Sequence, residues 1–232
     1  TAAMGVRVVK HGNRSISSRS GSADLLECLG LPQPLDEKRS GECLAATGFT
    51  FLFAPHYHPA MKEIAPVRRA LGVRTVFNLL GPLTNPAEPP FGLIGAYSRD
   101  AARLMAETLA GMPIQRVFVV HGEPGWDEPT PCGPFELYDV TPGHVVRTER
   151  DPLDCGLARC TPQSLAGGDA ARNAAGMRAV FTGQDRGSHR DALVLNAALA
   201  LEVTGTVADP HAAIRAASDA LDRGDGARLL DR

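Results

Sequence analysis

Short apolar runs alternate along this chain with longer segments that carry an apolar residue every three or four positions, which predicts strands followed by helices. The runs of strand length are residues 5–9, 48–54, 91–98, 115–122, 135–140 and 144–150. The segments with helical spacing are residues 22–30, 58–72, 75–86, 99–111 and 190–205. The last two strand-like runs flank Thr-Pro-Gly, which is typical of a hairpin turn.

The order of these segments predicts an α/β sheet covered by helices. From Gly168 onward the chain is expected to be mostly helical, and residues 31–47, which are polar and contain proline, are expected to be a connection. One region departs from the alternation. Between residues 56 and 86 two helices follow one another with no strand between them, so they are expected to pack away from the sheet. Gly81-Pro82 is expected to end the second one.

Composition narrows the classes of function. The 232 residues are 44% apolar, which is enough for one sizeable core. A net charge of -2 offers no broad basic surface for nucleic acid, and no apolar run approaches the ~20 residues of a membrane span. The start lacks the features of a signal peptide. Five cysteines without CxxC spacing indicate a reduced, cytoplasmic protein, although Cys155 and Cys160 could form a bridge.

A loop rich in serine, "KHGNRSISSRSGS", follows the first predicted strand and enters a helix. Glycines at 12 and 21 would let the backbone approach a ligand, and Ser22 is placed as a helix N-cap. With Lys10 and Arg14 nearby, the loop could form a cradle for phosphate. A solvated loop that merely caps its helix is an equally good interpretation of these residues.

Two further stretches carry possible chemistry. Adjacent carboxylates in "GEPGWDEPT", Asp127 and Glu128, could hold Mg²⁺, although a solvated acidic turn is the more common meaning of such a pair. Both this loop and the serine loop follow strands, and ligands bind at that edge of an open α/β sheet. In "PHYHPAMKEIAPVRRALG" the two histidines have no partners that complete a zinc site, and Arg68 or Arg69 could face either solvent or a carboxylate ligand.

Three motifs in succession resemble the anthranilate phosphoribosyltransferase family: "KHGNRSISSRSGSAD", "FLFAPHYHPAMKEIAPVRRALGVRTVFNLLGPLTNPA" and "HGEPGWDE". The resemblance runs from residue 1 to about residue 205. It implies a mixed central sheet of the nucleoside phosphorylase and phosphoribosyltransferase type. It also implies transfer of phosphoribose from phosphoribosyl pyrophosphate (PRPP) to the amino group of anthranilate, with Mg²⁺, in tryptophan biosynthesis. The implied partners are a second copy in a homodimer and the anthranilate synthase subunits.

The resemblance also assigns residues. Those that match PRPP contacts are Lys10, His11, Gly12, Asn13, Arg14, Ser15, Ile16, Ser17, Ser18 and Ser22. Those that match anthranilate contacts are Asn13, His58 and Arg68, and the magnesium carboxylates match Asp127 and Glu128. No acid or base is assigned, because the amine of anthranilate is neutral at physiological pH and already nucleophilic. Trp126 is bulkier than the small aliphatic residue expected at its position.

The family pattern further implies a division of the chain. Residues 1–55 and 87–232 are expected to form the α/β domain, and residues 56–86 are expected to pack with a small helical domain. That domain and a glycine-rich "GTGGD" loop that contacts PRPP belong to the family pattern, but the 232 residues contain neither. Activity of this chain alone is therefore not expected.

Three alternatives stay open. A pyrimidine nucleoside phosphorylase shares the fold, but the "APVRRALG" segment argues against it. A nucleic-acid-binding relative would need a basic surface, which the near-neutral charge does not supply. A non-catalytic remnant of the family is suggested by the missing glycine-rich loop.

Overall fold

The computed structural model describes residues 1–14, 19–60, 70 and 76–232. Its strands are β1 (Val8–Gly12), β2 (Phe49–Phe53), β3 (Phe91–Gly95), β4 (Arg116–Gly122), β5 (Phe135–Thr141) and β6 (His144–Arg150). Its helices are α1 (Ser22–Cys28), α2 (Glu37–Thr47), α3 (Ala54–Tyr57), α5 (Phe77–Leu83), α6 (Arg99–Leu109), α7 (Ala170–Phe181), α8 (Ser188–Val203), α9 (Pro210–Asp222) and α10 (Asp225–Leu230). The described residues also form the 3-10 turns η1 (Ala2–Met4), η2 (Pro152–Cys155) and η3 (Pro162–Leu165).

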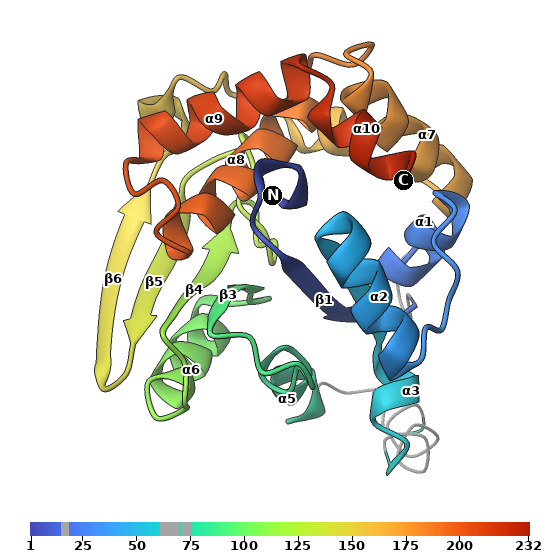
Figure 1. Cartoon of the computed structure of the whole chain (residues 1–232). Coiled ribbons are helices and arrows are strands. Elements are labelled where there is room, and N and C mark those ends of the chain that lie inside the picture. Colours follow the sequence, from blue (N-terminus) through green and yellow to red (C-terminus); the bar gives the residue numbers. More distant parts are fainter. Residues whose placement is uncertain (15–18, 61–69, 71–75) are drawn as a thin grey trace.

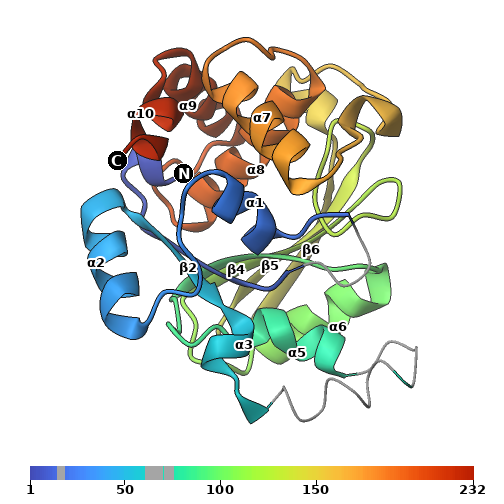
Figure 2. The same ribbon diagram turned by 90° about the vertical axis from the view of Figure 1, so that its right-hand side faces the viewer.

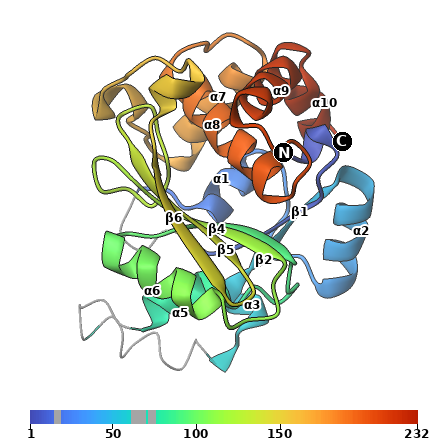
Figure 3. The same cartoon turned by 90° about the vertical axis from the view of Figure 1, so that its left-hand side faces the viewer.

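The strands form two groups, and helices cover both of their sides (Figure 1). β1 and β2 pair in parallel, whereas β3 to β6 form a mixed sheet in sequence order, with β3 and β4 parallel and the rest antiparallel. Helices α7 to α10 lie on one side of the strands, and α5 and α6 lie on the other (Figures 2 and 3). This arrangement confirms the predicted α/β class with a mixed sheet flanked by helices.

Two apolar cores lie on opposite faces of the larger sheet. Phe118 and Val120 of β4 belong to the core that packs against α8, while Val117 and Val119 belong to the core that packs against α6. Successive side chains of a strand point to opposite faces. The uninterrupted apolar run of β4 is therefore explained by burial on both sides.

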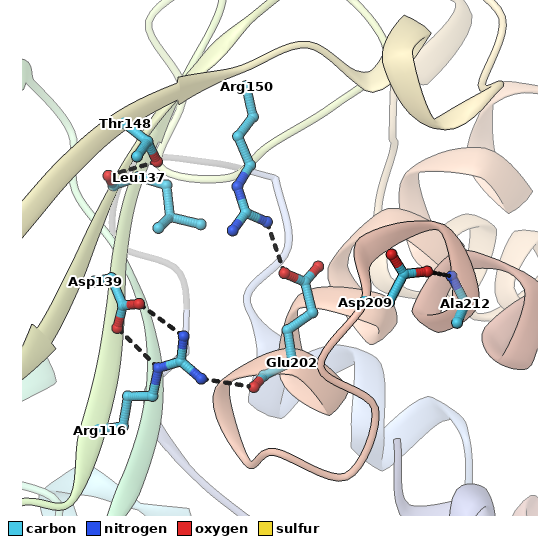
Figure 4. A network of polar contacts seen from close by, with 8 residues as sticks. All are labelled: Arg116, Leu137, Asp139, Thr148, Arg150, Glu202, Asp209 and Ala212. Carbon is cyan, nitrogen blue, oxygen red and sulfur yellow. Dashed lines mark hydrogen bonds and ion pairs between the residues drawn. The ribbon is translucent and has the colours of Figure 1, made fainter.

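A polar network ties the end of α8 to the edge of this sheet (Figure 4). The guanidinium group of Arg116 donates to both carboxylate oxygens of Asp139, at 2.8 and 2.7 Å, and to the backbone carbonyl of Glu202 at 3.2 Å. The carboxylate of Glu202, whose residue is only 5% exposed, accepts a hydrogen bond from Arg150 at 2.7 Å. Both arginines also lie against the ring of Phe118. The network gives the nearly buried carboxylate of Glu202 a charged hydrogen-bond partner.

Each of two strands leaves one edge open toward the space between the two groups. Among the described strands, β1 pairs with β2 alone and β3 with β4 alone. The amide of Val8 donates to Gly48, so the N–H and C=O groups of Val9 point to the other edge of β1. The side-chain amide of Asn85 donates to the Val9 carbonyl there, at 3.2 Å, across 76 residues of sequence.

Three predicted elements differ in the structure. The first strand begins at Val8 and not at residue 5, because Gly5 adopts φ 87° and ends the turn η1. Residues 37–47 form α2 where a connection was expected. Asp36 caps this helix by accepting from the Arg39 amide at 2.8 Å, and Gly48 closes it in the left-handed conformation. The prediction failed because α2 buries only Ser40 and so carries almost no apolar pattern.

The third difference is at α5, which continues through Gly81 and Pro82 to Leu83 instead of ending at them. A proline so close to the end removes only one helical hydrogen bond, and the hydroxyl of Thr84 donates back to the Leu80 carbonyl. The rest of the predicted helical segment 56–86 lies largely outside the described residues, so the proposed division of the chain stays a prediction. In the described part, no helix is both long enough and apolar enough to cross a membrane.

Candidate functional site

Residues from three predicted motifs line a single cleft of about 1770 Å³. Those of the predicted site are Lys10, His11, Gly12, Asn13, Ser22, His58 and Asp127. β1 ends at Gly12 and β4 ends at Gly122, and the two predicted loops follow these ends. The expectation that both loops meet at one edge of the strands is therefore confirmed for the part of the chain that the structure describes.

Two glycines allow the carboxylate loop to lie directly on the strand ends. A Cβ atom added to Gly95, the last residue of β3, would lie 1.6 Å from the carbonyl oxygen of Asp127. One added to Gly122, the last residue of β4, would lie 2.3 Å from the carbonyl oxygen of Glu128. Sequence reasoning missed both positions. The signal available was a glycine at the end of each of two apolar strands, where a close backbone approach is one common explanation.

The same loop closes on itself. The amides of Gly122 and Trp126 each donate to the other residue's carbonyl, at 2.9 Å in both directions. Gly125, at φ 106°, makes the turn between them. The side chain of Trp126, which is bulkier than expected at this position, is half-buried.

The electrostatics of the loop favour a bound cation. Burial raises the pKa of Glu128 above its ordinary value, and the neighbouring charge of Asp127 raises it further, while Lys10 acts in the opposite direction. Two neighbouring carboxylates that repel each other gain stability when a cation joins them. Lys10 of the serine motif is thus near enough to the acidic pair to act on it.

The donor set is open and does not form a closed metal cage. Within the described residues no group of three His, Cys, Asp or Glu side chains could hold a metal ion. Mg²⁺ commonly takes one or two carboxylates from a protein and completes its shell with water and phosphate oxygens. Asp127 and Glu128 fit that type of site.

Of the serine-loop residues assigned to PRPP, some lie within the described part of the structure and others lie outside it. Gly12 lies so close to Ser22 that a Cβ atom on the glycine would be 3.0 Å from the serine Oγ. The helix N-cap is Gly21, whose amide donates to Asp24 at 2.9 Å, so Ser22 is the first residue inside α1 and the predicted cap was wrong by one position. Ser15, Ile16, Ser17 and Ser18 lie outside the described residues.

Arg14 points to the helix instead of standing free for a ligand. Its guanidinium pairs with Asp24 at 2.7 Å and with Glu27. The hydrogen bonds with Glu27 and then Asp24 raise the pKa of Arg14 above its ordinary value. In this arrangement its charge is shared with α1, and a phosphate would have to compete for it.

Two histidines meet at the wall of the cleft. The rings of His11 and His58 are 5.0 Å apart, edge to face, and the Nε2 atom of each is buried with no hydrogen-bond partner among the described residues. Burial and then the charge of His58 lower the pKa of His11, against a hydrogen bond with the Gly81 backbone that raises it. His56 instead contacts Tyr57 at 5.2 Å, so the two histidines of the HxH pair face different neighbours. Arg68 lies outside the described residues.

Known proteins are similar to this chain over almost its whole length. Residues 1–227 match the model of the "Glycosyl transferase family, a/b domain". An anthranilate phosphoribosyltransferase of Rubrobacter xylanophilus is 45% identical over 98% of this chain and 67% of its own length. The protein of Streptomyces coelicolor named anthranilate phosphoribosyltransferase 2 is 47% identical over 100% of this chain and 69% of its own length. The chain thus spans about two thirds of the relatives that it matches.

Solved structures of anthranilate phosphoribosyltransferases are similar to this chain as well. The anthranilate phosphoribosyltransferase of Thermus thermophilus superposes with a TM-score of 0.90 at 43% identity, over 100% of this chain and 68% of that protein. The Saccharomyces cerevisiae enzyme in complex with PRPP and Mg superposes with a TM-score of 0.89 at 26% identity, over 99% of this chain and 65% of that protein. This chain therefore belongs to the glycosyl transferase a/b domain family and, within it, to the anthranilate phosphoribosyltransferases.

Proposed function

We propose that this chain forms the α/β part of an enzyme that transfers the 5-phosphoribosyl group from PRPP to the amino group of anthranilate. The products are N-(5-phosphoribosyl)anthranilate and pyrophosphate, and the step belongs to tryptophan biosynthesis. The observation that carries the proposal is that Lys10 and Asp127 line the same cleft at one end of the strands, with Lys10 near enough to Glu128 to favour its charged form. A cation and two carboxylates at one site suit a ligand that brings both phosphates and a divalent metal.

Asp127 and Glu128 would hold the magnesium ion, whose charge would neutralise the pyrophosphate as it leaves. For this, Glu128 must be ionised. Lys10 favours the charged form, against the burial and the Asp127 charge that oppose it. Lys10 itself would donate to a phosphate oxygen. Gly12 lets the end of β1 pack directly against Ser22, because a Cβ atom on the glycine would lie 3.0 Å from the serine Oγ.

Anthranilate would occupy the histidine side of the cleft. Asn13 and His58 line the cleft there, and Arg68 is assigned to the carboxylate of the substrate by the family motif. The lowered pKa of His11 keeps its ring neutral near pH 7. A neutral ring beside a planar aromatic substrate adds no charge that would repel the developing positive charge on the sugar. The arrangement acts by positioning and electrostatics, with no base required.

The single tryptophan provides a direct test, because Trp126 immediately precedes the carboxylate pair. Its fluorescence should change when PRPP and Mg²⁺ are added together to the 232-residue chain. The double variant Asp127→Asn/Glu128→Gln should lose the response, and Glu123→Gln in the same loop should keep it. An unchanged response in the double variant would remove these carboxylates from the site.

Turnover is tested by release of pyrophosphate from PRPP with and without anthranilate, on this chain joined to the part of a relative that it does not span. Release that does not depend on anthranilate would contradict the proposed acceptor. Formation of a homodimer and association with anthranilate synthase subunits stay predictions. Light scattering of the full-length protein, alone and with those subunits, would test them.

A further inference from the structure

Two cysteines distant in sequence are in contact at the base of the carboxylate loop. The Sγ atoms of Cys132 and Cys160 are 3.5 Å apart, across 28 residues of sequence. Sequence spacing allowed a bridge between Cys155 and Cys160 without requiring one, whereas in the structure Cys160 lies against Cys132. Both residues are half-buried, and neither lines the cleft described above.

The backbone holds the two residues in this position. The amide of Cys160 donates to the carbonyl of Pro131, the residue before Cys132, at 3.1 Å. An S–S bond is about 2.05 Å long, and the two sulfurs are 3.5 Å apart. A bond between the sulfurs therefore needs only a small approach of the two side chains.

The loop that carries Cys132 is itself well anchored. The buried hydroxyl of Thr130 accepts from the Cys132 amide at 3.3 Å, and the side-chain amide of Asn196 in α8 donates to the carbonyl of Pro129 at 2.9 Å. Because these contacts fix the segment that leads into Cys132, its thiol is held beside that of Cys160. This is the arrangement of a preformed dithiol.

We propose that Cys132 and Cys160 form a reversible dithiol–disulfide pair. In the oxidised form, the bond ties the loop that follows Asp127 and Glu128 to the segment between η2 and η3. The oxidant is a peroxide. One thiolate attacks the O–O bond, forming a sulfenic acid and releasing hydroxide, which takes up a proton to become water. The second sulfur then attacks the sulfenyl sulfur, forms the S–S bond and releases a second water.

The surroundings set the rate of this reaction. Burial, followed by the hydrogen bond with Cys132, raises the pKa of the Cys160 thiol. The thiolate is the reactive form, so Cys160 is a poor nucleophile at neutral pH. Oxidation should be slow at neutral pH and become faster as the pH rises, by up to roughly tenfold per pH unit. The pair should therefore respond to a sustained oxidant and not to a brief one.

The test oxidises the 232-residue chain with hydrogen peroxide, blocks the remaining thiols and maps the peptides by mass spectrometry. The expected product has lost two hydrogens and contains a peptide in which Cys132 is joined to Cys160. A reducing thiol should reverse it. Closure of a loop of this length should also raise the Tm, by on the order of 5 °C.

The variants Cys132→Ser and Cys160→Ser should each abolish the cross-link, whereas Cys155→Ser should keep it. Five blockable thiols after oxidation of the parent would overturn the proposal. So would a cross-link that persists in Cys132→Ser, or added oxygen at either cysteine in place of the bond. Peptide mapping of the parent needs no variant, so the result holds even if a serine variant folds poorly. The test uses no substrate and is independent of the proposed transfer reaction.

Discussion

Asp127 lies across the end of β3 so closely that Gly95 has no room for a side chain: a Cβ atom there would be 1.6 Å from the Asp127 carbonyl oxygen. Separations below 3 Å do not occur between such atoms, and the atom in the way is backbone. The identity of residue 95 and the position of the carboxylate loop therefore depend on each other.

The substitution Gly95→Ala is expected to displace the carboxylate loop. It should lower the free energy of unfolding by roughly 3 kcal/mol, because the backbone must move to relieve the overlap. It should also abolish the effect of Mg²⁺ with PRPP on Trp126 fluorescence. Gly176→Ala is the matched control, since nothing lies within 4 Å of a Cβ atom at that helical position. Equal stability of the two variants in urea would show that the loop does not need the glycine.

Glu128 should make the metal-free chain less stable at neutral pH than its neutral isostere does. Its pKa is raised in the folded chain, so the folded state binds the proton more tightly than the unfolded state. Stability then falls as the pH rises from the ordinary glutamate value of about 4.3 through the raised one. Glu128→Gln should raise the Tm at pH 7, and the gain should vanish below about pH 4.

Addition of Mg²⁺ and PRPP should reverse that order, because a bound ligand stabilises the parent and not the variant. Differential scanning fluorimetry at several pH values, with and without the ligands, measures both effects. A Glu128→Gln variant that stays the more stable of the two in saturating Mg²⁺ and PRPP would contradict the metal assignment.

Arg68 is expected to recognise the carboxylate of anthranilate through its planar guanidinium group. In the full-length enzyme, Arg68→Ala should raise the KM for anthranilate by roughly tenfold or more, since one charged hydrogen bond contributes ~1.5–3 kcal/mol. The KM for PRPP should change little. Arg69→Ala is the adjacent control, and an equal effect of the two substitutions on the KM for anthranilate would argue against a specific contact.

The carboxylate of Glu202 is nearly buried, and removal of Arg150 should take away its charged hydrogen-bond partner. The expected loss in the free energy of unfolding for Arg150→Met is about 2 kcal/mol. This is less than the ~3–5 kcal/mol of a fully buried pair, because solvent reaches the arginine. The double variant Arg150→Met/Glu202→Gln should recover part of the loss. Arg103→Met, which breaks an exposed pair with Glu107, should cost less than ~1 kcal/mol in the same urea titration.

The sequence predicted those parts of the fold that are marked by apolar periodicity. The hairpin of β5 and β6 was found because Thr-Pro-Gly separates two strand-like runs, and α8 was found because apolar residues dominate its sequence from Ala192 to Val203. α2 was missed because a helix that buries only Ser40 has no apolar face to detect. Its capping residues, Asp36 and Gly48, carried the only signal.

Site residues could be predicted from the sequence where they belong to a motif with a recognisable chemistry, and not where their role depends on three-dimensional contacts. Asp127, Glu128 and Lys10 could be named as candidate site residues from the sequence. The clearance at Gly95 and the contact between His11 and His58 depend on distant segments brought together, and no local pattern encodes them. The engagement of Arg14 by α1 is of the same kind, because a loop cation can bind either a ligand or its own helix.

The open edges of β1 and β3 have a consequence for how this chain behaves at high concentration. Backbone groups on a strand edge can hydrogen-bond to any extended polypeptide of suitable shape, so such edges act as templates for aggregation. The chain should therefore associate as its concentration rises, and static light scattering would show the increase in mass. A short apolar peptide that adds to the edges as a strand should suppress the association, whereas the same peptide with a proline at its centre should not.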